Sequence, residues 1–261
     1  VSMRMMKKVL GTVTVLALSV SLLAGCGSTA ASPVSSAAST AAESTTSSVV
    51  SEATSAAADE NAAAAAQLLN DLTGSYQELW PVILADEYKQ TWLDDCTALV
   101  GEDNAEAAFE KLSSMVTGDV YGEDAVKAYA NGGGAYFCGF TNDLATLTFD
   151  GEASTISGTD KDGNELFSHP YHYIGMEPVR GLYEFESDDA DSGEFTYFFL
   201  APDTSAETYH IEFRYGSDAD ALSQYDAGDY AYWLASGIST DCDQTMIDNC
   251  IELFCTENLA G

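Results

Sequence analysis

The side chains best suited to bind a ligand in this 261-residue chain lie in the stretch ETYHIEFRYG, residues 207–216, which holds one of only three histidines. Alternate side chains of a strand point to opposite faces, so we expect His210 and Glu212 on one face together with Arg214. An imidazole and a carboxylate two positions apart on one face can reach the same divalent ion, and both are accepted zinc ligands. The alternative is a plain polar strand face on which these three side chains form a surface ladder.

The other two histidines, His169 and His172, lie in a segment where Pro170 indicates an edge strand or a bulge. Residues three positions apart on a strand point to opposite faces, so these two histidines should too. We therefore expect them to share an ion only if a bulge shifts the phase of the strand.

The chain contains none of the common enzymatic motifs: no GxSxG elbow, HExxH helix, P-loop or GxGxxG turn. Its acidic pairs are too numerous to single out an acid and a base, so we predict no catalytic residues and no enzymatic activity. Neither acidic stretch, 160–165 or 188–194, combines the sixth-position glycine with the twelfth-position glutamate of a calcium loop. We expect them to be hairpin turns with solvated charges.

The first 26 residues predict export and a lipid anchor. Arg4, Lys7 and Lys8 precede an apolar run over 9–23, which ends in the lipobox-like LAGC of residues 23–26. The alternative, a membrane-spanning helix, needs about 20 apolar residues, and this run is shorter. We predict a signal peptide over 1–25 and lipidation of Cys26, which would hold the mature protein at the extracytoplasmic face of the cell membrane.

The rest of the chain divides into a tether and one domain. Residues 26–66 are rich in Ser, Ala and Thr and are expected to form a disordered tether, and residues 67–261 are expected to form a single domain. Loss of the signal peptide would leave 6 basic against 42 acidic residues, a formal charge of −36. Such a surface repels nucleic acid and attracts cations.

The folded part is predicted to be mainly β with flanking helices. Short segments rich in aromatic and β-branched residues, separated by turn residues, predict seven or so consecutive antiparallel strands, which favours a barrel or sandwich. The expected strands are 136–140, 145–149, 154–157, 166–174, 182–186, 195–200 and 208–215. Helical spacing is found over 76–84 and 105–116, and again in a closing helix over 243–254.

The cysteines leave their pairing open. Five cysteines follow Cys26, and no CxxC pair occurs among them. We therefore do not expect a zinc knuckle with thiolate ligands. Disulfides can form in an exported protein, and all five can equally be small core residues. These cysteines are Cys96, Cys138, Cys242, Cys250 and Cys255.

The order of several aromatic stretches resembles a known family, the ZinT (YodA-like) zinc- and cadmium-binding domains of bacteria. The resemblance covers roughly residues 69–254 and implies a lipocalin-like (calycin) antiparallel β-barrel with added helices. The stretches that carry it are LTGSYQELWP (72–81), YHYIG (171–175), GLYEFE (181–186), FTYFFLAP (195–202) and YHIEFRYG (209–216), followed by an aromatic stretch before the closing helix.

The resemblance also implies a zinc ion near the barrel mouth, held mainly by three histidines. One precedes a hydrophobic-Ala-Pro turn, where this chain has Phe198, and two form a His-x-His, which here is His210-Ile211-Glu212. The site carried over thus has two protein ligands, whereas zinc in comparable sites keeps at least three. Asp203, Glu207 or a histidine of the 171 strand are the candidates for a third.

The leading hypothesis is therefore a membrane-anchored protein that binds zinc or another divalent cation through His210 and Glu212. It would sequester the ion or deliver it to a component of a metal-uptake ABC transporter. The alternative is a metal-free barrel whose aromatic mouth, with Phe198, Tyr209 and Trp233, binds a small organic ligand or a glycan. A third hypothesis is a structural or adhesive surface domain.

Overall fold

The structure is a computed structural model that describes residues 60–204 and 210–260. The predicted signal peptide, the lipidation site Cys26 and most of the predicted tether lie outside the described residues and stay predictions. A helix over 60–71 spans the predicted boundary at residue 66, and its Ala65 is completely buried.

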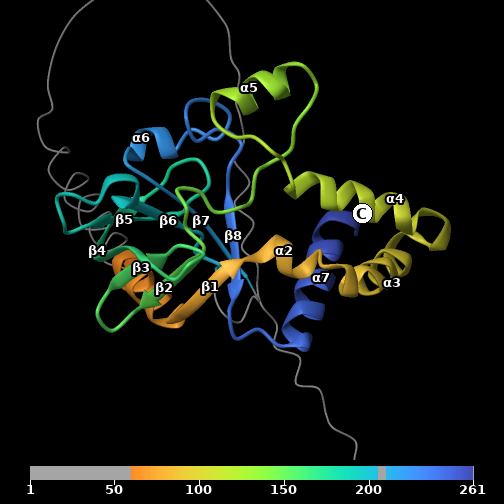
Figure 1. The fold of residues 1–261 in the computed structure, drawn as a ribbon, viewed down its shortest axis with the longest axis horizontal. Helices are drawn as coiled ribbons and strands as arrows, with labels where there is room; N and C mark the ends of the chain where they lie inside the picture. The colour runs from red at the N-terminus through yellow and green to blue at the C-terminus, as the bar shows by residue number, and fades with distance from the viewer. Residues whose placement is uncertain (1–59, 205–209, 261) are drawn as a thin grey trace, which may run out of the picture. The chain divides into compact units, whose positions relative to one another are not determined.

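Eight antiparallel strands form a closed barrel in which each strand pairs with the next along the chain, and β8 pairs with β1 (Figure 1). The predicted antiparallel barrel is therefore confirmed. The strands are β1 (Gly74–Glu78), β2 (Thr146–Asp150), β3 (Thr155–Thr159), β4 (Glu165–Met176), β5 (Tyr183–Ser187), β6 (Tyr197–Leu200), β7 (Ile211–Gly216) and β8 (Ala235–Ser239).

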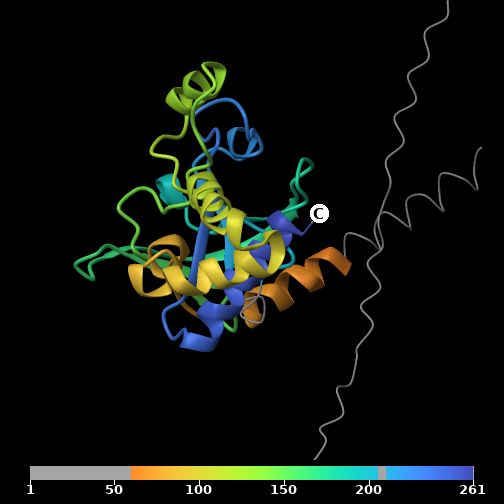
Figure 2. The ribbon, with the colours of Figure 1, turned by 90° about the vertical axis from the view of Figure 1, so that its right-hand side faces the viewer.

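Helices cover one side of the barrel. In both views the helices α3, α4 and α7 lie together beside β8 and α2, while α5 and α6 lie apart from that group (Figures 1 and 2). The helices are α2 (Leu79–Ile83), α3 (Lys89–Val100), α4 (Glu102–Val116), α5 (Glu123–Ala130), α6 (Ala219–Leu222) and α7 (Gln244–Leu259), with short 3-10 turns η1 (Asp86–Tyr88) and η2 (Gly193–Phe195).

The described residues contain two apolar clusters, one inside the barrel and one between the barrel and the helices. Aromatic rings fill the barrel interior: Phe198 stacks on Phe167 and Tyr215, with ring centroids 5.8 and 5.3 Å apart. The second cluster joins Ile238 of β8 to the buried faces of α2, α3, α4 and α7. Burial of the second cluster holds the helical layer against the β8 side of the barrel.

The hairpin turns expected from the sequence are present. Asp160 receives hydrogen bonds on Oδ1 from the backbone nitrogens of Asp162 and Asn164, at 2.8 and 2.9 Å, and Gly163 supplies the positive φ of 82° that the turn requires. This side chain is engaged in closing the β3–β4 turn, as the sequence predicts for an acidic hairpin loop.

Two predicted segments differ from the structure. The segment 136–140 is not a barrel strand, because Phe137 forms only isolated bridges to Thr117 and Trp233. The helical spacing over 76–84 conceals a change of structure at Glu78, where β1 ends and α2 begins. Tyr76 therefore points into the barrel core.

Arg214 of β7 lies on the outer side of the barrel but is completely buried, so the alternative of an exposed polar ladder is wrong for this residue. Its guanidinium donates to the carbonyl oxygens of Leu222 and Tyr230. It also lies 4.3 Å from the ring centroid of Tyr225. Arg214 thus ties the loop over 222–230 to the barrel wall.

Candidate metal site on the outer face of the barrel

His210 and Glu212 lie at the start of β7 and project away from the barrel interior. Ile211 and Phe213 are completely buried on the interior side, which confirms the predicted alternation, although His210 itself precedes the first residue of the strand. His210 Nε2 lies 4.0 Å from Glu212 Oε1, and their side chains are 23% and 43% exposed. The two side chains therefore lie on one face of the strand, as the alternation predicts.

The pair lines a cleft of about 190 Å³ between β7, the segment after β6 and the C-terminal half of α7. Two backbone-directed contacts fix the segment after β6: Ala201 N donates to Glu212 O at 3.0 Å, and Glu212 N donates to Thr204 Oγ1 at 3.2 Å. The cleft is lined by Asp203, Thr204, His210, Glu212, Leu253 and Glu257. One imidazole and three carboxylates thus border a single hollow.

Burial raises the pKa of Glu212, and the negative charges of Asp203 and Glu257 raise it further. His210 and Arg180 oppose this rise. A carboxylate whose ionised form is disfavoured by neighbouring carboxylates gains from a cation placed between them. The electrostatics of the cleft therefore favour occupation by a positive charge.

The ligand geometry is incomplete among the described residues. Two ligand atoms that each lie about 2.1 Å from a shared ion are at most about 4.2 Å apart. The distance of 4.0 Å between His210 Nε2 and Glu212 Oε1 therefore permits a shared ion with a wide ligand–metal–ligand angle. Within residues 60–204 and 210–260, no group of three or more His, Cys, Asp or Glu side chains is arranged to hold a metal. Glu207, one candidate for a third ligand, lies outside the described residues.

The histidines of β4 do not line the cleft. His169 Nδ1 lies 2.8 Å from Asp189 Oδ2, and His172 Nδ1 lies 2.7 Å from Asp188 Oδ1, so both are bonded to the loop that follows β5. His169 is on the more buried side of β4 and His172 on the exposed side, as predicted from their spacing. The structure gives no support to a third ligand from this strand.

Phe198 does not face His210 and Glu212. It is completely buried among the rings of the barrel interior, and it pairs in register with Tyr215, whose side chain also points inward. The position that the family resemblance assigns to a histidine is therefore on the opposite side of the barrel wall from the pair.

We expect Phe198→His to create no new ligand. The imidazole would replace a ring in a packed apolar interior, so we predict a loss of about 2 kcal/mol in the free energy of unfolding and no gain in zinc affinity. Urea unfolding and calorimetric titration would measure the two quantities, with Phe198→Leu as the control for lost ring packing. A tenfold increase in zinc affinity would contradict this placement.

The sequence indicated Asp203 as a candidate ligand but gave no indication of the α7 wall of the cleft. Leu253 and Glu257 belong to α7, and their distance along the chain from Glu212 concealed their proximity. The only available signal was the predicted packing of the closing helix on the barrel.

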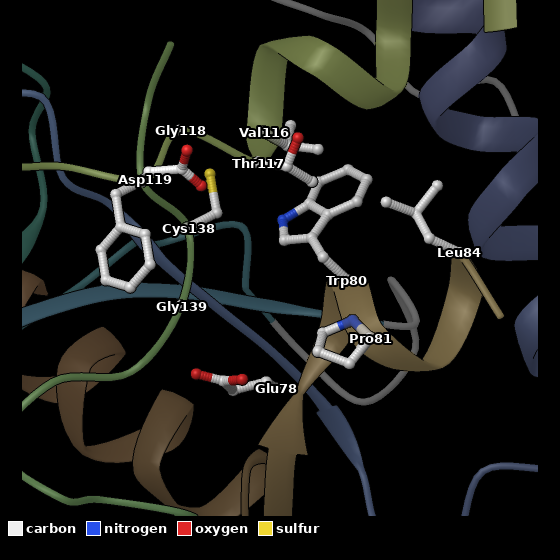
Figure 3. A pocket seen from close by; sticks show the side chains of 11 residues that line it. Glu78, Trp80, Pro81, Leu84, Val116, Thr117, Gly118, Asp119, Cys138 and Gly139 are labelled. Atoms are coloured by element: carbon white, nitrogen blue, oxygen red, sulfur yellow. The ribbon is translucent and has the colours of Figure 1, made fainter. Parts of the chain in front are cut away.

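A larger cavity, of about 490 Å³, lies beside the same helical layer between α2, the end of α4 and the segment 137–139 (Figure 3). The indole of Trp80 lies in Figure 3 between Leu84 and the thiol of Cys138, with the carboxylate of Glu78 across the hollow. Burial raises the pKa of Cys138 to about 12, so this thiol is protonated at neutral pH in the metal-free protein.

Comparisons with known proteins find similarity only to solved structures. No family model matches the sequence, and no curated protein matches it. The chain is similar to the ZinT-like domain of AdcA. The Zn(II)-bound crystal structure of that domain, from Streptococcus pneumoniae, has 16% sequence identity and a TM-score of 0.45, over 71% of this chain and 89% of the domain.

A second similar structure is that of Zn(II)-bound AdcA from Streptococcus pneumoniae itself. It has 15% identity and a TM-score of 0.41, over 74% of this chain. This chain spans 35% of that AdcA chain. The first of these two structures is described as a ZinT-like domain.

Proposed function

We propose that this protein binds a divalent metal ion, zinc in the first instance, on the outer face of its barrel through His210 and Glu212. The observation that carries the proposal is the approach of His210 Nε2 to within 4.0 Å of Glu212 Oε1 in a cleft bordered by two further carboxylates. Asp203 and Glu257 are the described residues from which a third ligand would come.

The donor chemistry decides which ions fit. Zinc accepts imidazole and carboxylate ligands, and the resemblance to ZinT domains names the same metal. A site with a single histidine and several carboxylates is also suited to harder cations than a three-histidine site is. We therefore expect weaker zinc affinity and broader metal selectivity than a three-histidine site would give.

The cellular part of the proposal is a protein held by lipidated Cys26 on the extracytoplasmic face of the membrane, where it sequesters zinc or delivers it to a metal-uptake ABC transporter. Support comes from the lipobox-like ending of the N-terminal apolar run. Among the described residues, no helix is long and apolar enough to cross a membrane. Mass spectrometry of the mature N-terminus tests the anchor, and an unmodified Cys26 thiol would contradict it.

Calorimetric titration of the purified protein with zinc tests metal binding. We expect one ion per chain with micromolar or tighter affinity. At free zinc one hundred times the dissociation constant, binding stabilises the folded state by about 2.7 kcal/mol, which corresponds to a rise of about 5–10 °C in the melting temperature. The absence of both a heat of binding and a thermal shift would contradict the proposal.

Replacing Glu212 by glutamine separates metal binding from stability. Burial raises the pKa of Glu212 in the folded state above its value in the unfolded chain. The stabilisation that comes from the neutral carboxyl is therefore fully present below the pKa of the unfolded chain, and it is lost as the pH rises through the pKa of the folded state. We therefore expect Glu212→Gln to raise the melting temperature of the metal-free protein slightly at pH 7 and to weaken zinc binding about tenfold or more.

The stability gain should be small because the Glu212 side chain is 43% exposed, and it should vanish near pH 4. Melting curves at both pH values, with and without zinc, measure these effects. Glu165→Gln, at an exposed position of β4, is the matched control. A variant with lower stability at pH 7 and undiminished zinc affinity would contradict the assignment.

The second candidate function is the binding of a small organic ligand. The residues proposed for an aromatic mouth do not support it, because Phe198 and Trp233 are completely buried and Tyr209 lies outside the described residues. The cavity beside Trp80 does support it, since about 490 Å³ is a usual size for such sites. Its lining includes Glu78 and Asp119 and no basic residue, which favours an organic amine.

Tryptophan fluorescence during titration with a diaminoalkane tests this second function. We expect saturable quenching that weakens in Asp119→Asn, while a neutral sugar serves as the control ligand. Equal responses to both compounds, or none, would exclude an amine site at Trp80.

A further inference from the structure

Two buried thiols lie next to each other where α3 packs on α7. The Sγ atoms of Cys96 and Cys255 are 3.9 Å apart, although the residues are separated by 159 positions along the chain. Both side chains are completely buried in the cluster between the helices and the barrel. Their proximity results entirely from tertiary packing.

Aromatic side chains surround this pair. Trp92 of α3 donates its indole N–H to the carbonyl oxygen of Ile83 at 2.7 Å. Phe254, which precedes Cys255, makes edge contacts with Trp92 and with Trp80, at centroid distances of 6.0 and 4.7 Å. These aromatic contacts hold the two helices in register beside the thiols.

We propose that Cys96 and Cys255 form a disulfide bond when the chain folds in an oxidising compartment. A disulfide requires sulfur atoms about 2.05 Å apart, so each sulfur must move by roughly 1 Å from its present position. Side-chain rotation and a slight approach of the helices can supply this movement. No other pair among the described cysteines has a sulfur–sulfur contact in the structure.

The oxidation needs an electron acceptor, which we assign to the disulfide of a thiol–disulfide oxidoreductase or of oxidised glutathione. One thiolate attacks the acceptor disulfide and releases one acceptor thiol, giving a mixed disulfide. The second cysteine then displaces the other acceptor sulfur. The pair loses two protons and two electrons in total, and the acceptor leaves as two thiols.

The bond is expected to form during folding rather than afterwards. Burial raises the pKa of both thiols, and the thiolate is the reactive form. α7 ends at residue 259, and its detachment would expose Cys255 to an oxidant. In the folded state the finished bond would be shielded from reductants.

The proposed bond involves the helix that forms one wall of the candidate metal cleft. Cys255 is between Leu253 and Glu257 on α7, and both of those residues line the cleft. Fixing Cys255 to α3 would therefore hold that wall in place. This consequence alone rests on the proposed metal binding, whereas the bond itself does not.

Peptide mapping of the metal-free protein tests the proposal. The full chain is refolded in a buffer of reduced and oxidised glutathione, denatured, alkylated without reduction, digested and analysed by mass spectrometry. We expect a linked peptide containing Cys96 and Cys255, with Cys138, Cys242 and Cys250 alkylated. Alkylation of both Cys96 and Cys255, or linkage of either to another cysteine, would overturn the proposal.

Thermal unfolding gives a second measurement. The oxidised protein should melt about 5–15 °C above the fully reduced protein. Cys255→Ala should abolish this difference, and Cys242→Ala, at a partly exposed position, should keep it. Because the mapping uses the unsubstituted chain without metal, its outcome does not depend on the folding of a variant or on zinc binding.

Discussion

Replacing His210 by alanine should lower zinc affinity at least about 100-fold, equivalent to about 2.8 kcal/mol of binding free energy. The imidazole is the only nitrogen donor among the residues that line the cleft, and it lies 4.0 Å from the carboxylate with which it would share the ion. Its loss leaves a set of carboxylates, which bind zinc less well than a mixed set does. Competition of the variant against a zinc-sensitive dye would measure the change.

The matched control is His172→Ala, which removes an exposed imidazole bonded to Asp188 outside the cleft. This variant should keep the affinity of the unsubstituted protein. If His172→Ala abolished binding and His210→Ala did not, the metal would lie at β4 rather than at β7. If neither variant changed the affinity, the His210–Glu212 site would be wrong.

Replacing Arg214 by alanine should reduce the free energy of unfolding by about 3–5 kcal/mol. The side chain is completely buried, and its removal leaves the carbonyl oxygens of Leu222 and Tyr230 without their donor. It also removes the guanidinium from the face of Tyr225. Urea unfolding followed by circular dichroism measures the loss.

Arg180→Ala is the control for this second prediction. Arg180 also lies over the ring of Tyr225, at 4.4 Å, but it is exposed. We expect it to cost less than about 1 kcal/mol. Arg214→Lys should recover only part of the loss, because an ammonium cannot present two parallel donors in the plane of a guanidinium. Equal losses for Arg180→Ala and Arg214→Ala would contradict the structural role of Arg214.

Most strands of the barrel could be predicted because they carry strong local signals. The hairpins β2–β3 and β3–β4 contain Asp-Gly turns, and β5 and β7 alternate buried and outward side chains. These signals act over a few residues, so a single sequence is enough to find them.

The two strands that close the barrel were missed for different physical reasons. In β1 the apolar side chains continue into α2 at helical spacing. No local sequence feature therefore marks the change from strand to helix at Glu78. In β8 the sequence ASGIS is dominated by small residues, which have little strand propensity. Gly237 leaves room for its neighbours there, because a Cβ atom would lie 3.0 Å from Ile211 Cγ1 and 3.3 Å from Gln77 O, and Ile211 would have to shift by a few tenths of an ångström.

The candidate site was predictable only in part. The alternation along one strand brought His210 and Glu212 to the same face, which needs no tertiary information. The packing of Glu257 against them depends on the position of α7, which is set by the apolar cluster around Ile238 and Ile251. The same packing set the position of Cys255 beside Cys96.

The aromatic filling of the barrel restricts where a ligand could bind. Rings such as those of Phe198, Phe213 and Tyr215 occupy the space that hollow relatives of such barrels use for a guest molecule. An ion held outside the wall, by contrast, can be approached by a recipient protein without any strand parting from its neighbour. Loading and unloading would then depend on encounter at the surface, and the closed sheet would act as a rigid support throughout.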